Sequence, residues 1–103
     1  MTAPIARASV PATMSHVIDN RAEQEFTLDI DGHRAVAAYQ LEGRTIVFTH
    51  TVVPPAIEGR GVGSKLIRAA LDSARDQGLN VVPQCPFIAA YIERHPEYRD
   101  LVR

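Results

Sequence analysis

The sequence contains a single cysteine, Cys85, and no tryptophan. One cysteine excludes a disulfide within the chain and a zinc site made of several cysteines. Basic residues are not in excess either, because the net charge is −1 and no basic cluster is present. That balance argues against a nucleic-acid-binding protein. The composition indicates a protein of the reducing cytoplasm.

Long apolar runs are also missing. The segment Met1–Met14 is interrupted by Pro4 and Pro11, and it lacks the unbroken apolar stretch of about seven residues or more that a signal peptide needs. A membrane span would have to be longer still. We therefore predict a flexible tail over residues 1–14, no membrane partner, and one domain over residues 15–103, which is an ordinary domain size.

The first half of the chain reads as strands. Apolar and polar residues alternate over Phe26–Asp31, and the stretch Thr45–Val53 is nearly all β-branched or aromatic. The dipeptide Asp31-Gly32 is typical of a hairpin turn. The predicted strands are His16–Asn20, Phe26–Asp31, Arg34–Leu41 and Thr45–Val53.

The second half predicts a helix, a strand and a shorter helix. Apolar residues recur at helical spacing over Gly61–Gln77, and Gly78 follows as a stop signal. Leu79–Gln84 has the length of a buried strand, Phe87–Arg94 is a short helix, and Glu97–Val102 adds one helical turn. Together the elements predict an α+β fold, with a mixed, mainly antiparallel sheet that includes a β-α-β unit.

The loop between the Thr45–Val53 strand and the long helix carries glycines at positions 59, 61 and 63. The first turn of a helix has unpaired N–H groups, and the helix dipole adds positive potential there. Glycines let the backbone approach a bound anion closely. This arrangement predicts a site for a diphosphate.

Two common phosphate loops do not fit. A P-loop needs glycine directly before the lysine, and here Ser64 precedes Lys65. A dinucleotide fingerprint needs a third glycine where Leu66 stands.

The same segment resembles the Gcn5-related N-acetyltransferase superfamily, whose pyrophosphate loop reads Gln/Arg-x-x-Gly-x-Gly/Ala. Glu58-Gly59-Arg60-Gly61-Val62-Gly63 matches it at both glycines. The chain further resembles a minimal branch of about a hundred residues or fewer, described as N-acetyltransferase domain-containing, through His50-Thr51-Val52-Val53-Pro54 and Cys85. The likeness extends roughly from His16 to Val102.

This resemblance implies acetyl-CoA as cosubstrate, no metal, and transfer of the acetyl group to a small amine or a protein amine. The strand end at Thr51, Val52 and Val53 would hold the pantetheine arm through main-chain hydrogen bonds. The backbone amides that would hold the pyrophosphate are those of Gly59, Arg60, Gly61, Val62, Gly63 and Ser64. Positive charge near the phosphates would come from Arg60, Lys65 and Arg68, unless these are ordinary surface charges.

Glu58 departs from the pattern, because a carboxylate stands where the superfamily has Gln or Arg. We expect its side chain to point away from the phosphates. The acceptor is not revealed, and a monomer and a homodimer are both compatible with the sequence.

Cys85 and His50 are catalytic candidates because both lie at strand ends beside the expected thioester. Cys85 would be an acyl-accepting nucleophile or a thiol in contact with the acetyl group, helped by the helix that begins near Phe87; the alternative is a small buried apolar residue. His50 would be the general base. Strand alternation places His50 on the same face as Phe48, which predicts that its side chain is partly buried. The alternative role is therefore a hydrogen-bonded structural histidine.

Tyr91 is the third catalytic candidate. The superfamily often protonates the leaving thiolate with a tyrosine on this last helix, and Tyr98 is a weaker choice; core packing is the alternative for both. The other histidines, His16, His33 and His95, have no metal-ligand spacing. Two other functions stay open, namely a CoA-binding module without chemistry and a hydrolase of acyl thioesters that uses Cys85.

Overall fold

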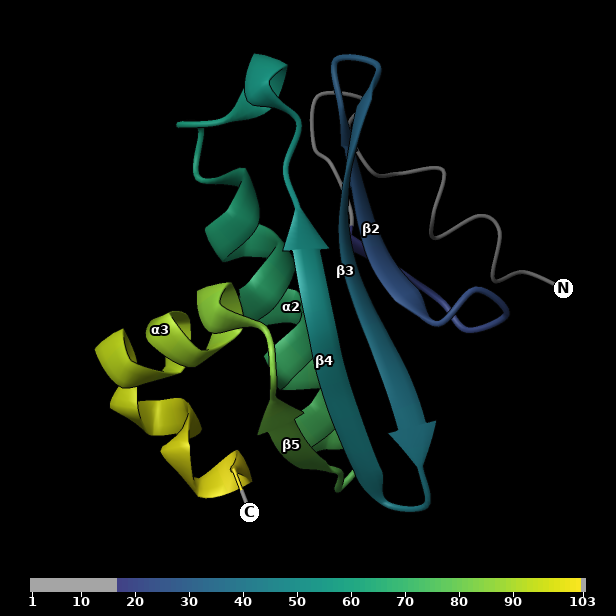
Figure 1. The fold of residues 1–103 in the computed structure, drawn as a ribbon, viewed down its shortest axis with the longest axis vertical. Coiled ribbons are helices and arrows are strands. Elements are labelled where there is room, and N and C mark those ends of the chain that lie inside the picture. Colours follow the sequence, from purple (N-terminus) through teal and green to yellow (C-terminus); the bar gives the residue numbers. More distant parts are fainter. Residues whose placement is uncertain (1–16, 103) are drawn as a thin grey trace, which may run out of the picture.

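The computed structural model describes residues 17–102, so the predicted tail and His16 lie outside the described residues. Its sheet has five strands in the order β1-β2-β3-β4-β5, antiparallel except for the parallel pair β4 and β5. The strands are β1 (Val17–Asn20), β2 (Glu25–Ile30), β3 (His33–Glu42), β4 (Thr45–Val52) and β5 (Asn80–Pro83). The predicted α+β fold is confirmed (Figure 1).

Helices follow the strands in the second half of the chain. They are α2 (Val62–Asp76) and α3 (Pro86–Arg94), with 3-10 turns η1 (Pro55–Ile57) and η2 (Pro96–Leu101). The long helix is one residue shorter at each end than predicted, because Gly61 adopts a left-handed conformation as the N-cap and Gln77 is the C-cap. Between residues 17 and 102, no helix has the length and apolar character needed to cross a membrane.

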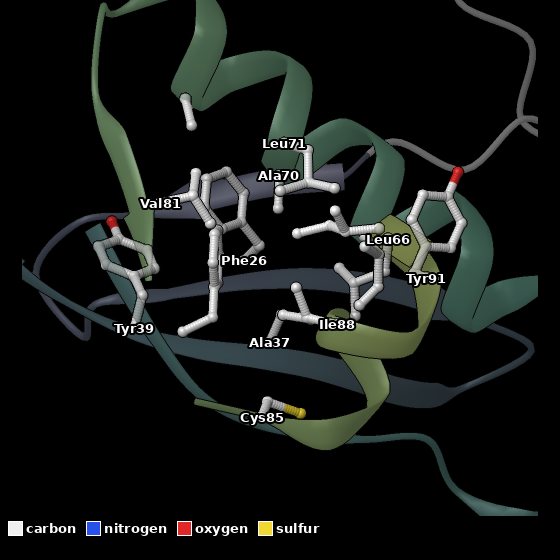
Figure 2. Close-up of a cluster of buried hydrophobic side chains, with 14 of the residues drawn as sticks. Phe26, Ala37, Tyr39, Leu66, Ala70, Leu71, Val81, Cys85, Ile88 and Tyr91 are labelled. Atoms are coloured by element: carbon white, nitrogen blue, oxygen red, sulfur yellow. The ribbon is translucent and has the colours of Figure 1, made fainter. Parts of the chain in front are cut away.

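The core lies between α2 and one face of the sheet, and α3 closes its end (Figure 2). The buried residues of α2 are Val62, Gly63, Leu66, Ile67, Ala70, Leu71 and Ala74. They meet strand residues such as Phe26, Ala37 and Val81, while Ile88 enters from α3. Burial of these apolar side chains is the main stabilising contribution to the fold.

A β-bulge in β4 changes which side chains face the core. His50 pairs with Ala38, but the next pair is Phe48 with Tyr39, so Thr49 is an extra residue. Because neighbours in a strand point to opposite faces, His50 lies on the face opposite Phe48. The prediction that His50 shares a face with Phe48 and is partly buried is wrong, since His50 is exposed.

Strands β4 and β5 separate just beyond this bulge. They are paired from Thr45 with Asn80 to Phe48 with Pro83. One further hydrogen bond, from the Cys85 N–H to the Phe48 carbonyl at 3.0 Å, follows. Beyond it, the edge of β4 that faces β5 has no partner strand in the described chain.

Tyr39 joins β3 to the edge strand β1. Its side chain is 3% exposed, and its hydroxyl donates a hydrogen bond of 2.6 Å to Asp19. Burial, and then this hydrogen bond, raises the pKa of Tyr39 to about 12.

We expect this tyrosine to make the protein sensitive to alkaline pH. Between about pH 10 and the folded-state pKa of about 12, the unfolded chain loses a proton that the folded chain retains. Tyr39 should then lower the free energy of unfolding by about 1.4 kcal/mol per pH unit, and Tyr98 adds a similar amount, whereas below about pH 10 neither tyrosine lowers it. Urea unfolding across this window measures the slope. Tyr39→Phe should make the slope shallower, and an unchanged slope would contradict the assignment.

Candidate functional site

A surface pocket of 270 Å³ lies at the beginning of α2. It is lined by Val53, Glu58, Gly59, Gly61, Val62, Gly63, Ser64 and Phe87. All of these except Phe87 belong to the glycine loop or the strand end to which the sequence points. The pocket therefore coincides with the predicted diphosphate loop.

The backbone of the loop leaves its amide groups available. The first helical hydrogen bond runs from the Lys65 N–H to the Gly61 carbonyl, at 3.0 Å. Among residues 17–102, no acceptor is found for the amides of Gly59 to Ser64. Gly59 and Gly61 have φ of 84° and 72°, a left-handed conformation that glycine adopts at little cost. The loop therefore offers several unpaired donors at the positive end of a helix, which suits an anion.

The basic residues around the loop do not all serve it. Arg60 forms an ion pair of 2.5 Å with Asp31, in the turn between β2 and β3. Lys65, in the first turn of α2, is exposed and has no ion-pair partner in the described part of the chain. Glu58 is exposed and lines the pocket. Of these two cations, Arg60 is therefore held by Asp31, whereas Lys65 has no such partner among residues 17–102.

Cys85 lies where β4 and β5 separate. It is 3% exposed and is the N-cap residue of α3. Its Sγ is 3.4 Å from the Thr51 Oγ1, and either atom can donate. The thiol and the end of β4 are therefore in contact, as expected for residues on either side of one gap.

The His50 side chain lies on the face of the sheet opposite α2. Its imidazole has no hydrogen-bond partner among the residues that the structure describes. Residues 17–102 contain no group of three or more His, Cys, Asp or Glu side chains that could hold a metal ion. His50 is thus exposed, and no residue between 17 and 102 holds its imidazole.

Tyr91 lies in the core instead of the gap. It is 1% exposed, its ring stacks on His95 at 4.0 Å between centroids, and its hydroxyl has no hydrogen-bond partner within residues 17–102. In Figure 2 the Tyr91 hydroxyl and the Cys85 sulfur lie at different sides of the core.

Tyr98 anchors the C-terminal turn to α2. Its hydroxyl donates a hydrogen bond of 2.7 Å to Asp72, and burial, followed by this bond, raises the pKa of Tyr98 to about 12. Arg75 on the same helix pairs with Asp100 at 2.9 Å. These contacts fasten η2 onto α2, which is a structural role.

Comparison with known proteins decides the family. The family model described as GCN5-related N-acetyl-transferase matches residues 25–101. The chain belongs to the GCN5-related N-acetyltransferase family. The region matched begins at β2 and ends within η2, so it contains the glycine loop, the pocket and Cys85.

Curated relatives and a solved structure agree with this membership. Protein NATD1 of Homo sapiens is 36% identical over 80 residues, covering 75% of this chain and 71% of NATD1. Protein NATD1 of Mus musculus is 32% identical over 100 residues, covering 89% and 91%. The solution structure of a GCN5-like protein from Staphylococcus aureus has a TM-score of 0.67 and 28% identity, covering 87% of this chain and 91% of that one.

Phe87 is the pocket residue that the sequence reasoning missed. A Cβ atom added to Gly63 would lie 2.6 Å from Cζ of the Phe87 ring, so the ring sits directly on that glycine. An aromatic residue in the first turn of α3, directly after Pro86, is visible in the sequence. Its place over the glycine loop is not, because α2 and α3 meet only in the folded chain.

Proposed function

We propose that this protein is an N-acetyltransferase that uses acetyl-CoA and acts on a small amine or a protein amine. The observation that carries the proposal is the row of amides from Gly59 to Ser64 at the head of α2, which have no acceptor within residues 17–102. Hydrogen bonds to a charged acceptor contribute about 1.5–3 kcal/mol each. Three or four of them would dominate the binding of a diphosphate.

The end of β4 continues from this loop toward the gap. On one edge β4 is paired with β3, at Thr51 with Ala37 and Val52 with Val36. The other edge of β4 is not paired with β5 at these residues, so its backbone groups are open to a ligand. We assign the backbone of Thr51, Val52 and Val53 to the amide groups of the pantetheine arm, which would place the thioester near Cys85.

The chemistry requires an unprotonated amine and stabilisation of negative charge on the thioester oxygen. His50 is exposed on β4 and is assigned as the base that takes the proton from the amine. Cys85 and Thr51 are assigned to contact with the acyl group. Tyr91 is assigned to packing, because its ring stacks on His95 and lies at a different side of the core from Cys85 (Figure 2).

A CoA-binding module without catalysis is the second candidate. It is favoured by Glu58, because this residue lines the pocket and its carboxylate disfavours a diphosphate there. The third candidate, a thioester hydrolase, is favoured only by the contact between the Cys85 thiol and Thr51.

Titration calorimetry with acetyl-CoA, followed by thiol release in the presence of a panel of amines, separates these candidates. Thiol release that depends on an amine supports the transferase. Binding without thiol release indicates the CoA-binding module. The hydrolase is indicated by thiol release in the absence of an amine, if Cys85→Ser abolishes this release and mass spectrometry shows an acetyl adduct on the wild type. A protein that does not bind acetyl-CoA overturns all three.

Glu58→Gln is expected to tighten the binding of acetyl-CoA. A carboxylate ~7 Å from a diphosphate costs roughly 0.6–2.4 kcal/mol, so its removal should lower Kd by about three-fold to fifty-fold. Calorimetry at low salt measures the change, and Glu42→Gln, at the far end of β3, is the control. An unchanged Kd would mean that the carboxylate lies well away from the phosphates.

A further inference from the structure

Phe87 is a large apolar side chain at the surface of the site. It lies in the first turn of α3 and is 42% exposed. Its ring rests on Gly63, where a Cβ atom would approach Cζ to 2.6 Å. An exposed aromatic ring in the wall of a surface pocket points to a contact with a molecule outside the chain.

The pocket has two kinds of wall. The amides of Gly59 to Ser64 form the polar one, and Val53 and Phe87 supply accessible apolar side chains. A diphosphate uses only the polar wall. The apolar side chains remain for a part of the ligand that carries no charge.

Phe87 also lies on the path between the loop and the reacting end. It is two positions after Cys85, whose Sγ contacts Thr51 at the separation of β4 and β5. Phe87 lines the same pocket as the glycine loop and Cys85 is the N-cap of α3, so a chain that runs from the diphosphate to Cys85 passes the first turn of α3. In CoA this chain is the uncharged pantetheine arm, which carries a carbon with two methyl groups one CH2 group away from the diphosphate.

We propose that Phe87 is a specificity-determining residue that packs against the pantetheine arm, so that the site distinguishes CoA from its bare nucleotide part. Gly63 is part of the same contact, because only glycine leaves room for the Phe87 ring at this position. This assignment rests on the proposed function.

The test compares two probes on the full chain by calorimetry. One probe is CoA and the other is adenosine 3′-phosphate 5′-diphosphate, which is CoA without the pantetheine arm. Phe87→Ala is expected to weaken CoA binding by about ten-fold, the loss that follows when a half-exposed aromatic contact is removed, and to leave the nucleotide within about two-fold. Phe87→Leu should fall between. Ile18→Ala, which removes an exposed apolar side chain from β1, should change neither.

Gly63→Ala gives an independent reading of the same contact. It should weaken CoA binding by displacing the ring, and Gly63→Ala combined with Phe87→Ala should bind CoA no worse than Phe87→Ala alone. Thermal melting shows that each variant remains folded.

The outcomes are distinct. Equal weakening of both probes in Phe87→Ala, or no weakening of either, overturns the assignment of the ring to the arm. A wild-type protein that binds the nucleotide and CoA equally well overturns it too, while leaving the phosphate site in place. A wild-type protein that binds neither probe overturns the proposed function and this proposal with it.

Discussion

Ser64→Pro is expected to weaken the binding of acetyl-CoA by about ten-fold to a hundred-fold, because it deletes one N–H donor to a charged acceptor. Ser64 lies in the first turn of α2, where its amide has no acceptor among the described residues. Proline is tolerated in the first turn of a helix, since no helical hydrogen bond is lost there. The substitution therefore removes a ligand contact while leaving the helix in place.

The matched control is Ser64→Ala, which keeps the amide and removes only an exposed hydroxyl. It should bind acetyl-CoA within about two-fold of the wild type, as surface substitutions do. Calorimetry gives both dissociation constants, and circular dichroism confirms that α2 is retained. If Ser64→Pro binds as tightly as Ser64→Ala, the Ser64 amide does not contact the phosphates.

His50→Gln is expected to lower kcat/KM by about a hundred-fold or more, the usual contribution of a general base. Since His50 lies on the face of β4 opposite the core and is exposed, its replacement should not disturb folding. Acetyl-CoA affinity should stay unchanged, because the predicted cofactor contacts come from other residues.

The control for this substitution is His33→Gln, which changes an exposed histidine at the beginning of β3. The control should keep the activity of the wild type, because His33 is given no role in the reaction. Steady-state rates of thiol release with the same amine measure both variants, and His50→Gln should fall well below His33→Gln. Equal activity of the two variants would assign the base to another group.

Local patterns in the sequence predicted most of the elements. Alternation predicted β2, and helical spacing predicted α2 and α3 close to their observed bounds. These patterns follow from the backbone geometry of strands and helices, which repeats within a few residues. The glycine loop was found for the same reason, since its glycines and the helix start are neighbours in the chain.

The orientation of His50 could not be predicted in this way. Strict alternation puts it beside Phe48, but the extra residue Thr49 reverses the faces. A bulge depends on how β4 pairs with β3, so it is a property of two strands and not of one. Arg60 is a similar case, because its partner Asp31 lies in a distant turn.

The sequence by itself determined the order of the elements, the loop that leaves unpaired amides at a helix start, and the position of Cys85 at a strand end. These features depend on residues that are close in the chain. Only the tertiary structure decided that His50 faces the open side of the sheet, that Tyr91 is buried, and that Phe87 covers Gly63. These features arise from strand register and from packing between α2 and α3, and such contacts exist only after distant segments have come together.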